Sequence, residues 1–293
     1  MTLLLRPRRS VLYMPGANAR ALDKARTLPA DGLILDLEDA VAPEAKDLAR
    51  QQVVAAVRQG GYGPREVVVR INALASPWGR ADVEALGNCA ADAVLAPKIE
   101  SADDVHTLVA ALDEAGAPGD LPVWAMVETP RAFLRLETIA GSHPRLAVLV
   151  LGTSDLVKEL HARHSKGRAE TATARSLAVL AARAYGLGAL DGVHLDLDDE
   201  DGLVLACAQG RDMGYDGKTL IHPKQIAAAN AAFGPLPEEL SAAREIVTAW
   251  RHAQAAGKGV VVVNGRLVER LHVEDAERLL AIADAIARNL AAT

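Results

Sequence analysis

Two apolar stretches in the middle of the chain decide its fold: Val123-Trp124-Ala125-Met126-Val127-Glu128 and Leu146-Ala147-Val148-Leu149-Val150-Leu151-Gly152. Each is too short to span a membrane and ends at a turn. Such a stretch is typical of a strand buried on both faces, as in a parallel sheet. A carboxylate stands at or just after the end of each stretch, Glu128 at the end of the first and Asp155 three residues after the second. The C-terminal ends of buried parallel strands are where α/β enzymes place their functional residues.

The same alternation of apolar and amphipathic segments runs through most of the chain. The expected strands are Ser10–Met14, Gly32–Leu37, Glu66–Ile71, Ala93–Pro97, Pro122–Val127, Leu146–Leu151, Val193–Leu195 and Lys218–Ile221. The expected helices are Ala19–Leu28, Pro43–Arg58, Gly79–Ala90, Ala102–Ala115, Arg131–Ala140, Thr171–Tyr185, Asp199–Met213 and Pro223–Phe233. Strands alternating with helices in this number predict a (β/α)8 barrel. An open doubly wound sheet is the alternative, but no GxGxxG follows the first strand.

The last part of the chain adds elements that a barrel does not need. The sequence predicts a helix over Pro237–Ala256, a short strand or extended segment over Gly259–Arg266, and a helix from about His272 to Leu290. We therefore expect a barrel domain of residues 1–235. Residues 236–293 would form a C-terminal extension that packs elsewhere, for example on a neighbouring subunit.

Composition excludes several classes of protein. The net charge is −6, from 32 basic and 38 acidic residues, with no long block of one sign. Binding to nucleic acid or to an anionic membrane through bulk charge is therefore not expected. Cys89 and Cys207 stand apart, which indicates neither a disulfide framework nor a zinc cluster. Met1–Ser10 lacks the order of a secretory signal, and no apolar stretch approaches ~20 residues, so we expect a cytoplasmic protein.

One connection is unusual in its composition. The segment His161–Ala169 is polar, basic and without periodicity, and it comes after the strand that precedes Asp155. On a barrel it would lie at the active face, where long polar loops often act as lids. A mobile surface loop is the equally good alternative.

Charged or polar residues stand at the ends of nearly all the expected strands. In chain order they are Asp36, Glu38, Asp39, Arg70, Asn72, Lys98, Glu100, Glu128, Asp155, Asp196 and His222. Parallel strands bring such residues to one rim of the barrel. Because buried charges are costly unless they are paired or bound to a metal, this gathering needs an explanation. A salt-bridge network of Arg70 and Lys98 with the carboxylates is the alternative to an active site.

The residue types at this rim favour magnesium. Glu128 and Asp155 have no adjacent His or Cys, and two carboxylates with water and substrate oxygens suit Mg²⁺ better than zinc. Arg70 is suited to bind a substrate carboxylate or a developing oxyanion. Of Asp36, Glu38 and Asp39, one could serve the metal through a water, one could orient Arg70 or Lys98, and one could be solvated.

Two other features carry two interpretations each. His222 could be a base or the cap of the next helix. Arg20 and Lys24, four apart on the first expected helix, could meet a phosphate or form a solvated helical face.

Seven motifs occur in unbroken order along the chain. They are Arg9–Gly16, Leu35–Val41, Val69–Asn72, Pro97–Glu100, Glu128–Pro130, Gly152–Leu156 and Gly217–Pro223. Together they resemble the citrate lyase β-subunit-like (CitE-like) proteins of the HpcH/HpaI aldolase/citrate lyase family. The resemblance covers residues 9 to about 275. That group includes Mg²⁺-dependent carbon–carbon lyases such as the malyl-CoA and citramalyl-CoA lyases.

The resemblance implies a (β/α)8 TIM barrel of the phosphoenolpyruvate/pyruvate-binding type, assembled as a homotrimer or hexamer. It implies that Glu128 and Asp155 bind the metal and that Arg70 contacts substrate. In the lyases and thioesterases of the group, a C-terminal segment delivers a catalytic aspartate to the neighbouring active site. The matching position here is Glu269, which keeps the carboxylate but adds a methylene.

The remaining candidate residues complete the expected site. Glu38 and Asp39 are the further catalytic candidates beside Arg70 and Glu269. Lys98, Gly152 and Thr153 are expected to bind substrate together with Arg70, and Arg20 and Lys24 to bind CoA.

We therefore expect a carbon–carbon lyase that uses Mg²⁺, with Mn²⁺ as a substitute. It would reversibly cleave a short β-hydroxyacyl-CoA, such as malyl-, citramalyl- or citryl-CoA, into acetyl-CoA and a 2-oxo acid. Glu269 of a neighbouring subunit or a water would exchange the proton with the enolate carbon. The alternatives are a CoA-independent class II pyruvate aldolase and the β subunit of a multi-subunit citrate lyase with little activity alone.

Overall fold

The computed structural model describes residues 6–87 and 89–291, and in these ranges the chain divides into two compact units. Arg8–Phe233 forms the barrel unit. The C-terminal unit contains the chain from Gly234 onward, together with Arg6 and Pro7. The leucines of the N-terminal pattern lie outside the described residues.

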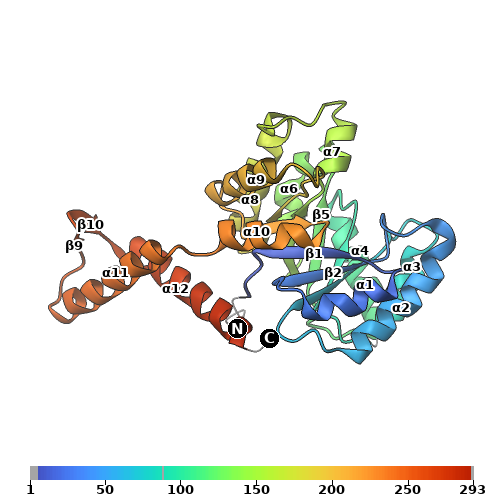
Figure 1. Cartoon of the computed structure of the whole chain (residues 1–293), viewed down its shortest axis with the longest axis horizontal. Coiled ribbons are helices and arrows are strands. Elements are labelled where there is room, and N and C mark those ends of the chain that lie inside the picture. Colours follow the sequence, from blue (N-terminus) through green and yellow to red (C-terminus); the bar gives the residue numbers. More distant parts are fainter. Residues whose placement is uncertain (1–5, 88, 292–293) are drawn as a thin grey trace. The chain divides into compact units, whose positions relative to one another are not determined.

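Eight parallel strands form a closed barrel in the barrel unit, in the order β1 to β8. Closure comes from β8 pairing with β1, where Ser10 lies beside Lys218. The strands are β1 Ser10–Pro15, β2 Gly32–Asp36, β3 Glu66–Arg70, β4 Ala93–Ala96, β5 Val123–Val127, β6 Leu146–Leu151, β7 Gly188–Asp191 and β8 Gly217–Leu220. Helices surround the strands (Figure 1), so the predicted TIM barrel is confirmed.

Helices follow the strands around the barrel. They are α1 Ala19–Lys24, α2 Lys46–Gln59, α3 Gly79–Leu86, α4 Ala102–Glu114, α5 Pro130–Leu134, α6 Leu136–Ala140, α7 Thr153–Glu159, α8 Ala172–Ala184, α9 Glu200–Asp212 and α10 Ile226–Phe233. Short 3₁₀ turns occupy Ala25–Thr27, Pro43–Ala45, Ala169–Thr171 and Pro223–Gln225. Side-chain caps fix several starts: Ser101 accepts a hydrogen bond from the Asp104 amide, and Thr129 from the Ala132 amide.

The strands are buried on both faces because their side chains alternate between two cores. In β5, Trp124 and Met126 point into the barrel with Val11, Ile34 and Leu190 among others. The neighbouring Val123, Ala125 and Val127 belong to the larger core shared with the surrounding helices. This two-sided burial explains why the strands appear in the sequence as continuous apolar stretches.

The seventh strand was predicted in the wrong place. It was expected at Val193–Leu195, but β7 is Gly188–Asp191, paired with β6 and β8. The cause lies in the turn after α8, where Gly186 adopts a φ of +69° and lets the chain enter the sheet two residues later. The strand therefore ends at Asp191, and Asp196 lies on an exposed loop.

Helix α7 was not predicted. It begins directly after β6 and Gly152, so Asp155 stands in the first turn of a helix. The polar segment His161–Ala169 follows α7 instead of following the strand, and most of its residues are exposed. Its role as a lid stays a prediction.

The C-terminal unit is a helical hairpin with a β-ribbon between its helices. It contains α11 Pro237–Ala255, β9 Val261–Val263, β10 Arg266–Val268 and α12 Arg270–Ala291. The predicted extended segment is thus a strand pair, joined by Asn264 and Gly265 with φ values of +50° and +75°, as a two-residue hairpin requires. A small core includes Val247, Trp250 and Val273. Across the part of the chain that is described, no helix is long and apolar enough to cross a membrane.

Candidate active site

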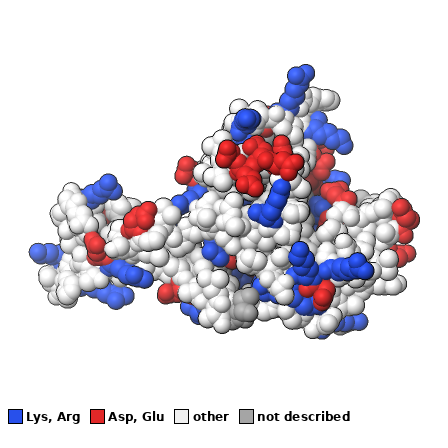
Figure 2. Space-filling model, in the orientation of Figure 1, with Lys and Arg blue, Asp and Glu red and all other residues white. Residues whose placement is uncertain are grey.

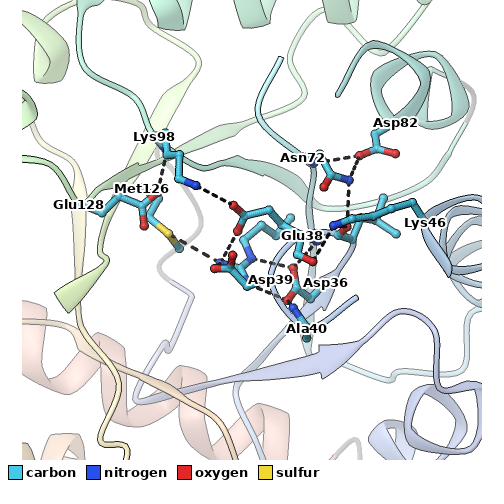
Figure 3. A network of polar contacts seen from close by, with 12 residues as sticks. Asp36, Glu38, Asp39, Ala40, Lys46, Asn72, Asp82, Lys98, Met126 and Glu128 are labelled. Carbon is cyan, nitrogen blue, oxygen red and sulfur yellow. Dashed lines mark hydrogen bonds and ion pairs between the residues drawn. The ribbon is translucent and has the colours of Figure 1, made fainter. Parts of the chain in front are cut away.

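Asp36 and Arg70, the last residues of β2 and β3, form a buried ion pair at the rim. Arg70 donates from Nε and Nη2 to the two Asp36 oxygens, at 2.7 and 2.6 Å. Asp36 is fully buried and also accepts hydrogen bonds from the backbone amides of Glu38 and Ala40, at 2.9 and 3.1 Å. Asp36 therefore orients Arg70, and its contact with Ala40 (Figure 3) also shapes the turn that follows β2.

The third guanidinium nitrogen of Arg70, Nη1, contacts two further carboxylates. Nη1 lies 2.8 Å from Glu38 Oε2 and donates to Asp39 Oδ2 at 3.2 Å. The guanidinium carbon lies 4.7 Å from the ring centroid of Tyr13, within range of a cation–π interaction. Burial lowers the pKa of Arg70, but Asp36, Tyr13 and Glu38 raise it by more. The pKa of Arg70 is therefore well above the ordinary value.

Lys98 connects this group of charges to the next strand. It follows β4 with a φ of +54°, which is uncommon for a residue other than glycine and marks a constrained backbone. In this conformation its amide donates to Glu128 Oε1 at 2.8 Å. Its Nζ lies 3.6 Å from Glu38 Oε1, so Glu38 lies between the cations of Arg70 and Lys98 (Figure 3).

Glu128 follows β5 and is only 2% exposed. Burial, together with the charges of Glu38 and Asp155, raises the pKa of Glu128 to about 8, although the Lys98 amide opposes this. In the described ranges no Lys or Arg side chain forms an ion pair with Glu128. A carboxylate in such surroundings is stabilised in its charged form when a cation approaches.

The start of α7 packs against Glu128. At Gly152, which precedes the helix, an added Cβ would overlap the Glu128 carboxylate. Thr153, the first residue of α7, is buried, and Asp155 is half-buried. The Asp155 charge raises the pKa of both Glu128 and Lys98, which places it near both.

The residues at this rim fit a magnesium ion. Five carboxylates (Asp36, Glu38, Asp39, Glu128 and Asp155) face two cations, Arg70 and Lys98, so the site has an excess of negative charge. Within residues 6–87 and 89–291, no three His, Cys, Asp or Glu side chains are grouped as a metal cage. Mg²⁺ does not require one, because it keeps several waters and takes one or two carboxylates with substrate oxygens.

A supporting network of hydrogen bonds holds the turn after β2, and no sequence pattern predicts it. Lys46, buried in α2, donates from Nζ to the carbonyls of Leu37 and Glu38, at 2.9 and 2.8 Å. Asn72 donates to the Leu37 carbonyl as well, at 2.9 Å, and is held in turn by Asp82 (Figure 3). These contacts join residues that have no common pattern in the sequence.

The other predicted residues lie apart from this network. His222 caps the 3₁₀ turn after β8, since its Nδ1 accepts from the Lys224 amide, so the capping interpretation is confirmed. Arg20 and Lys24 are exposed on α1, which follows β1. Glu269 belongs to the C-terminal unit, where it is exposed directly before α12. The roles predicted for Arg20, Lys24 and Glu269 stay predictions.

Several residues at or behind the rim were not anticipated. Tyr13 lies against Arg70, and Met126 Sδ lies 3.9 Å from Arg70 Nη1. Asp191, at the end of β7, would have been found had that strand been placed correctly. It pairs with Arg168 at 2.6 Å.

The surface in Figure 2 carries both signs of charge. Lys and Arg are interspersed with Asp and Glu over most of the drawn face. An acidic group lies beside α9, whose first turn and preceding loop contain exposed Asp196, Asp198, Glu200 and Asp201. No element of the site described above depends on this group.

Comparison with known proteins gives three consistent results. The family model described as HpcH/HpaI aldolase/citrate lyase matches residues 9–223. A (3S)-malyl-CoA thioesterase of Cereibacter sphaeroides is 47% identical over 281 residues, 96% of each chain. The citrate lyase subunit beta of Escherichia coli is 37% identical over 284 residues, 95% of this chain and 94% of that protein.

Solved structures agree with these matches. The crystal structure of CitE from Mycobacterium tuberculosis in complex with magnesium, acetoacetate and coenzyme A is similar with a TM-score of 0.73 at 34% identity. The match covers 94% of this chain and 97% of that one. A citrate lyase beta subunit from the same organism, complexed with oxaloacetate and magnesium, has a TM-score of 0.68 at 34% identity, over 80% of this chain and all of that one.

Proposed function

The chain belongs to the HpcH/HpaI aldolase/citrate lyase family, and from this premise we propose that it is a Mg²⁺-dependent carbon–carbon lyase. Its substrate would be a short β-hydroxyacyl-CoA such as malyl-CoA, cleaved into acetyl-CoA and a 2-oxo acid. The observation that carries the proposal is the buried Glu128 carboxylate, whose pKa is raised to about 8 by burial and by the charges of Glu38 and Asp155. The relatives named for malyl-CoA and the neighbour bound to magnesium and coenzyme A support it.

Glu128 and Asp155 would hold the metal. When bound there, Mg²⁺ supplies a Lewis acid and a template for the oxygens of the hydroxy or oxo acid. Gly152 and Thr153 lie at the start of α7 beside Glu128, which suits the substrate contacts predicted for them.

The chain's own residues would carry the proton and the charge. Glu38 would accept the proton of the substrate hydroxyl. Its pKa is raised to about 7, chiefly by burial, and a base whose pKa lies near neutral pH transfers protons well. The electron pair of the breaking carbon–carbon bond then passes to the acetyl-CoA enolate. Arg70 and Lys98 would stabilise the negative charge of the acid product and of the enolate. Glu269, supplied by a neighbouring subunit, would protonate the enolate carbon.

Hydrolysis of the thioester is the second candidate. The relatives that are 47% identical over nearly the whole chain are named (3S)-malyl-CoA thioesterase. The same site could serve both reactions, since Arg70 and the metal would also stabilise an oxyanion formed at the thioester carbonyl.

Product analysis separates the two reactions. With (3S)-malyl-CoA and Mg²⁺, cleavage yields acetyl-CoA and glyoxylate, whereas hydrolysis yields malate and the free thiol of CoA. We expect acetyl-CoA and glyoxylate, both abolished by EDTA and by Glu128→Gln. Glu137→Gln, an exposed glutamate on α6, is the matched control and should leave turnover intact. Free thiol without glyoxylate would favour the thioesterase, and turnover independent of metal would contradict the proposal.

The two alternatives from the sequence have their own readouts. Aldol cleavage of hydroxy-oxo acids that lack CoA would indicate a pyruvate aldolase. Activity that appears only when other citrate lyase subunits are added would indicate a β subunit, as the 37% identity to citrate lyase subunit beta suggests.

A further inference from the structure

A second cluster of charges is buried behind the rim, between the barrel strands and α9. Asp191 of β7 and Lys218 of β8 are both fully buried. Arg168 donates from Nη1 and Nη2 to the two Asp191 oxygens, at 2.7 and 2.6 Å, and also to the Ala206 carbonyl of α9. Lys218 Nζ lies 3.3 Å from the same carboxylate.

The cluster contains more cations than carboxylates. Arg175, 3% exposed, donates to the Arg168 carbonyl at 3.2 Å, but its Nε and Nη1 have no hydrogen-bond partner among the described residues. Three cations thus share one carboxylate, Asp191, and only Arg168 among them is partly exposed. Because burying ions in this way costs more than the pairs return, stability alone is a poor explanation for the cluster.

The cluster binds both the amide and the carbonyl of one glycine, Gly192. Asp191 Oδ1 accepts a hydrogen bond from the Gly192 amide at 2.9 Å, and Lys218 Nζ donates to the Gly192 carbonyl. A Cβ on Gly192 would lie 2.5 Å from both Cγ2 and Oγ1 of Thr153. The Thr153 side chain therefore rests directly on a backbone segment that Asp191 and Lys218 hold in place.

Thr153 begins α7, and Asp155 follows within the same turn. On its other side, the start of α7 contacts Glu128. Gly152 lies so near the Glu128 side chain that there is no room for a Cβ at this position. The helix start is thus held between Glu128, which follows β5, and Gly192, which follows β7. Arg168 stands nine residues after the last residue of α7, in a left-handed conformation with φ of +55°, so the cluster also holds the far end of the segment that follows the helix.

We propose that Arg168, Asp191 and Lys218 are positioning residues that hold α7 so that Asp155 and Glu128 can bind one metal ion. This inference rests on the proposed function in one respect, that Glu128 and Asp155 bind Mg²⁺. The three residues touch neither metal nor substrate. They act through Gly192 and Thr153 at the start of the helix and through Arg168 at the far end of the segment that follows it.

Magnesium affinity of the full-length chain tests the proposal. Mg²⁺ alone is titrated calorimetrically into wild type, Arg168→Lys and Asp191→Asn. We expect binding weaker by about tenfold or more, the loss typical when residues that support metal ligands are changed. The melting temperature of each variant in EDTA is measured in parallel, to report any general loss of stability.

Arg9→Lys is the matched control. Arg9 pairs with Asp31 through two hydrogen bonds of 2.8 Å, and its side chain is 13% exposed, the same as that of Arg168. It should lower the melting temperature to a similar extent and leave Mg²⁺ affinity unchanged. If Arg168→Lys and Asp191→Asn behave like Arg9→Lys, the cluster is merely structural and the inference is overturned.

A second pair of variants covers the case in which Asp191→Asn does not fold. Gly192→Ala should weaken Mg²⁺ binding because the new Cβ displaces Thr153. Gly192→Ala combined with Thr153→Ala removes the two Thr153 atoms at 2.5 Å, leaves only Thr153 Cβ at 3.0 Å, and should restore most of the affinity. Unchanged Mg²⁺ affinity in Gly192→Ala, or no restoration in the double variant, would refute the route through Thr153.

Wild type separates this inference from the proposed function. If wild type binds Mg²⁺ and all variants bind it equally well, only the inference fails. If wild type does not bind Mg²⁺ and Glu128→Gln changes nothing, the proposed function fails and the inference fails with it.

Discussion

The Arg70 guanidinium holds three carboxylates of very different exposure. Asp36 is fully buried beneath it, Glu38 is 9% exposed at its side, and Asp39 is 61% exposed. A buried ion pair cannot lose one partner without leaving an uncompensated charge, whereas an exposed partner is replaced by water. The three acids that could not be told apart in the sequence therefore differ in their expected effects on stability.

Asp36→Asn is expected to destabilise the fold by about 3 kcal/mol, because it removes the charge that compensates buried Arg70. Urea denaturation measures the free energy of unfolding. Asp39→Asn, the exposed partner of the same guanidinium, should change it by less than about 1 kcal/mol. Equal effects of the two substitutions would contradict this order.

Glu38 makes stability depend on pH in the metal-free protein. Burial is the main cause that raises the pKa of Glu38 from 4.5 to about 7. The charges of Asp39 and Asp36 raise it as well, and Arg70 opposes the shift. The folded state therefore holds a proton that the unfolded chain releases. This contribution to stability is complete below the unfolded pKa of 4.5 and is lost as pH rises through about 7.

Glu38→Gln should remove that loss. In EDTA we expect the variant to be more stable than wild type by roughly 2 kcal/mol near pH 8 and similar to it below about pH 5. Thermal unfolding across this range provides the measurement. A constant difference at every pH would show that the ionisation of Glu38 has no part in it.

At the scale of elements, the turn between β2 and α2 brings Glu38 to Arg70. Its carbonyls at Leu37 and Glu38 are bound by Lys46, whose Nζ also lies 5.2 Å from the ring centroid of Trp78. Asn72, two residues after β3, donates a hydrogen bond to the Leu37 carbonyl. The shape of this turn therefore depends on side chains from two other elements.

Lys46→Met keeps the length of the side chain and removes its donor. We expect a loss of about 2 kcal/mol in the free energy of unfolding, because two carbonyls lose a buried partner. Lys166→Met, at an exposed position of the loop after α7, should be neutral within about 0.5 kcal/mol. A neutral Lys46→Met would mean that water replaces the ammonium without cost.

At the scale of the whole molecule, the candidate residues fall into two units. Glu128, Asp155 and Arg70 belong to the barrel unit, whereas Glu269 belongs to the C-terminal unit. If Glu269 serves the site of a neighbouring subunit, the two carboxylates Glu128 and Glu269 of one active site come from different chains.

Co-expression of Glu128→Gln and Glu269→Gln chains tests this arrangement. Each variant alone should be inactive, but random assembly would give about a quarter of the sites an intact Glu128 and an intact Glu269. Partial recovery of lyase activity is therefore expected. Co-expression of Glu128→Gln with Asp155→Asn is the control, since both residues belong to one chain's site and no recovery should follow.

The sequence predicted most of the fold because the information was local. Buried parallel strands such as β5 and β6 appear as continuous apolar stretches, and their ends locate Arg70, Lys98 and Glu128. The same reasoning placed the seventh strand wrongly, because Val193 and Leu195 are apolar but Gly188–Asp191 is the segment that pairs with β6. Strand pairing depends on the neighbours in the sheet, which a single segment does not specify.

Family membership could thus be determined from the sequence alone, and the assignment of Glu128 and Asp155 to a metal stays a prediction from it. Only the tertiary structure decided which acid does what: Asp36 orients Arg70, Glu38 bridges Arg70 and Lys98, and Asp39 is exposed to solvent. It also brought together the buried cluster around Asp191, whose members come from the loop after α7 and from β7 and β8. The reason is physical. The burial of apolar side chains leaves a pattern along the chain. An ion pair or a contact with a carbonyl joins residues that are far apart in the sequence and leaves no such pattern.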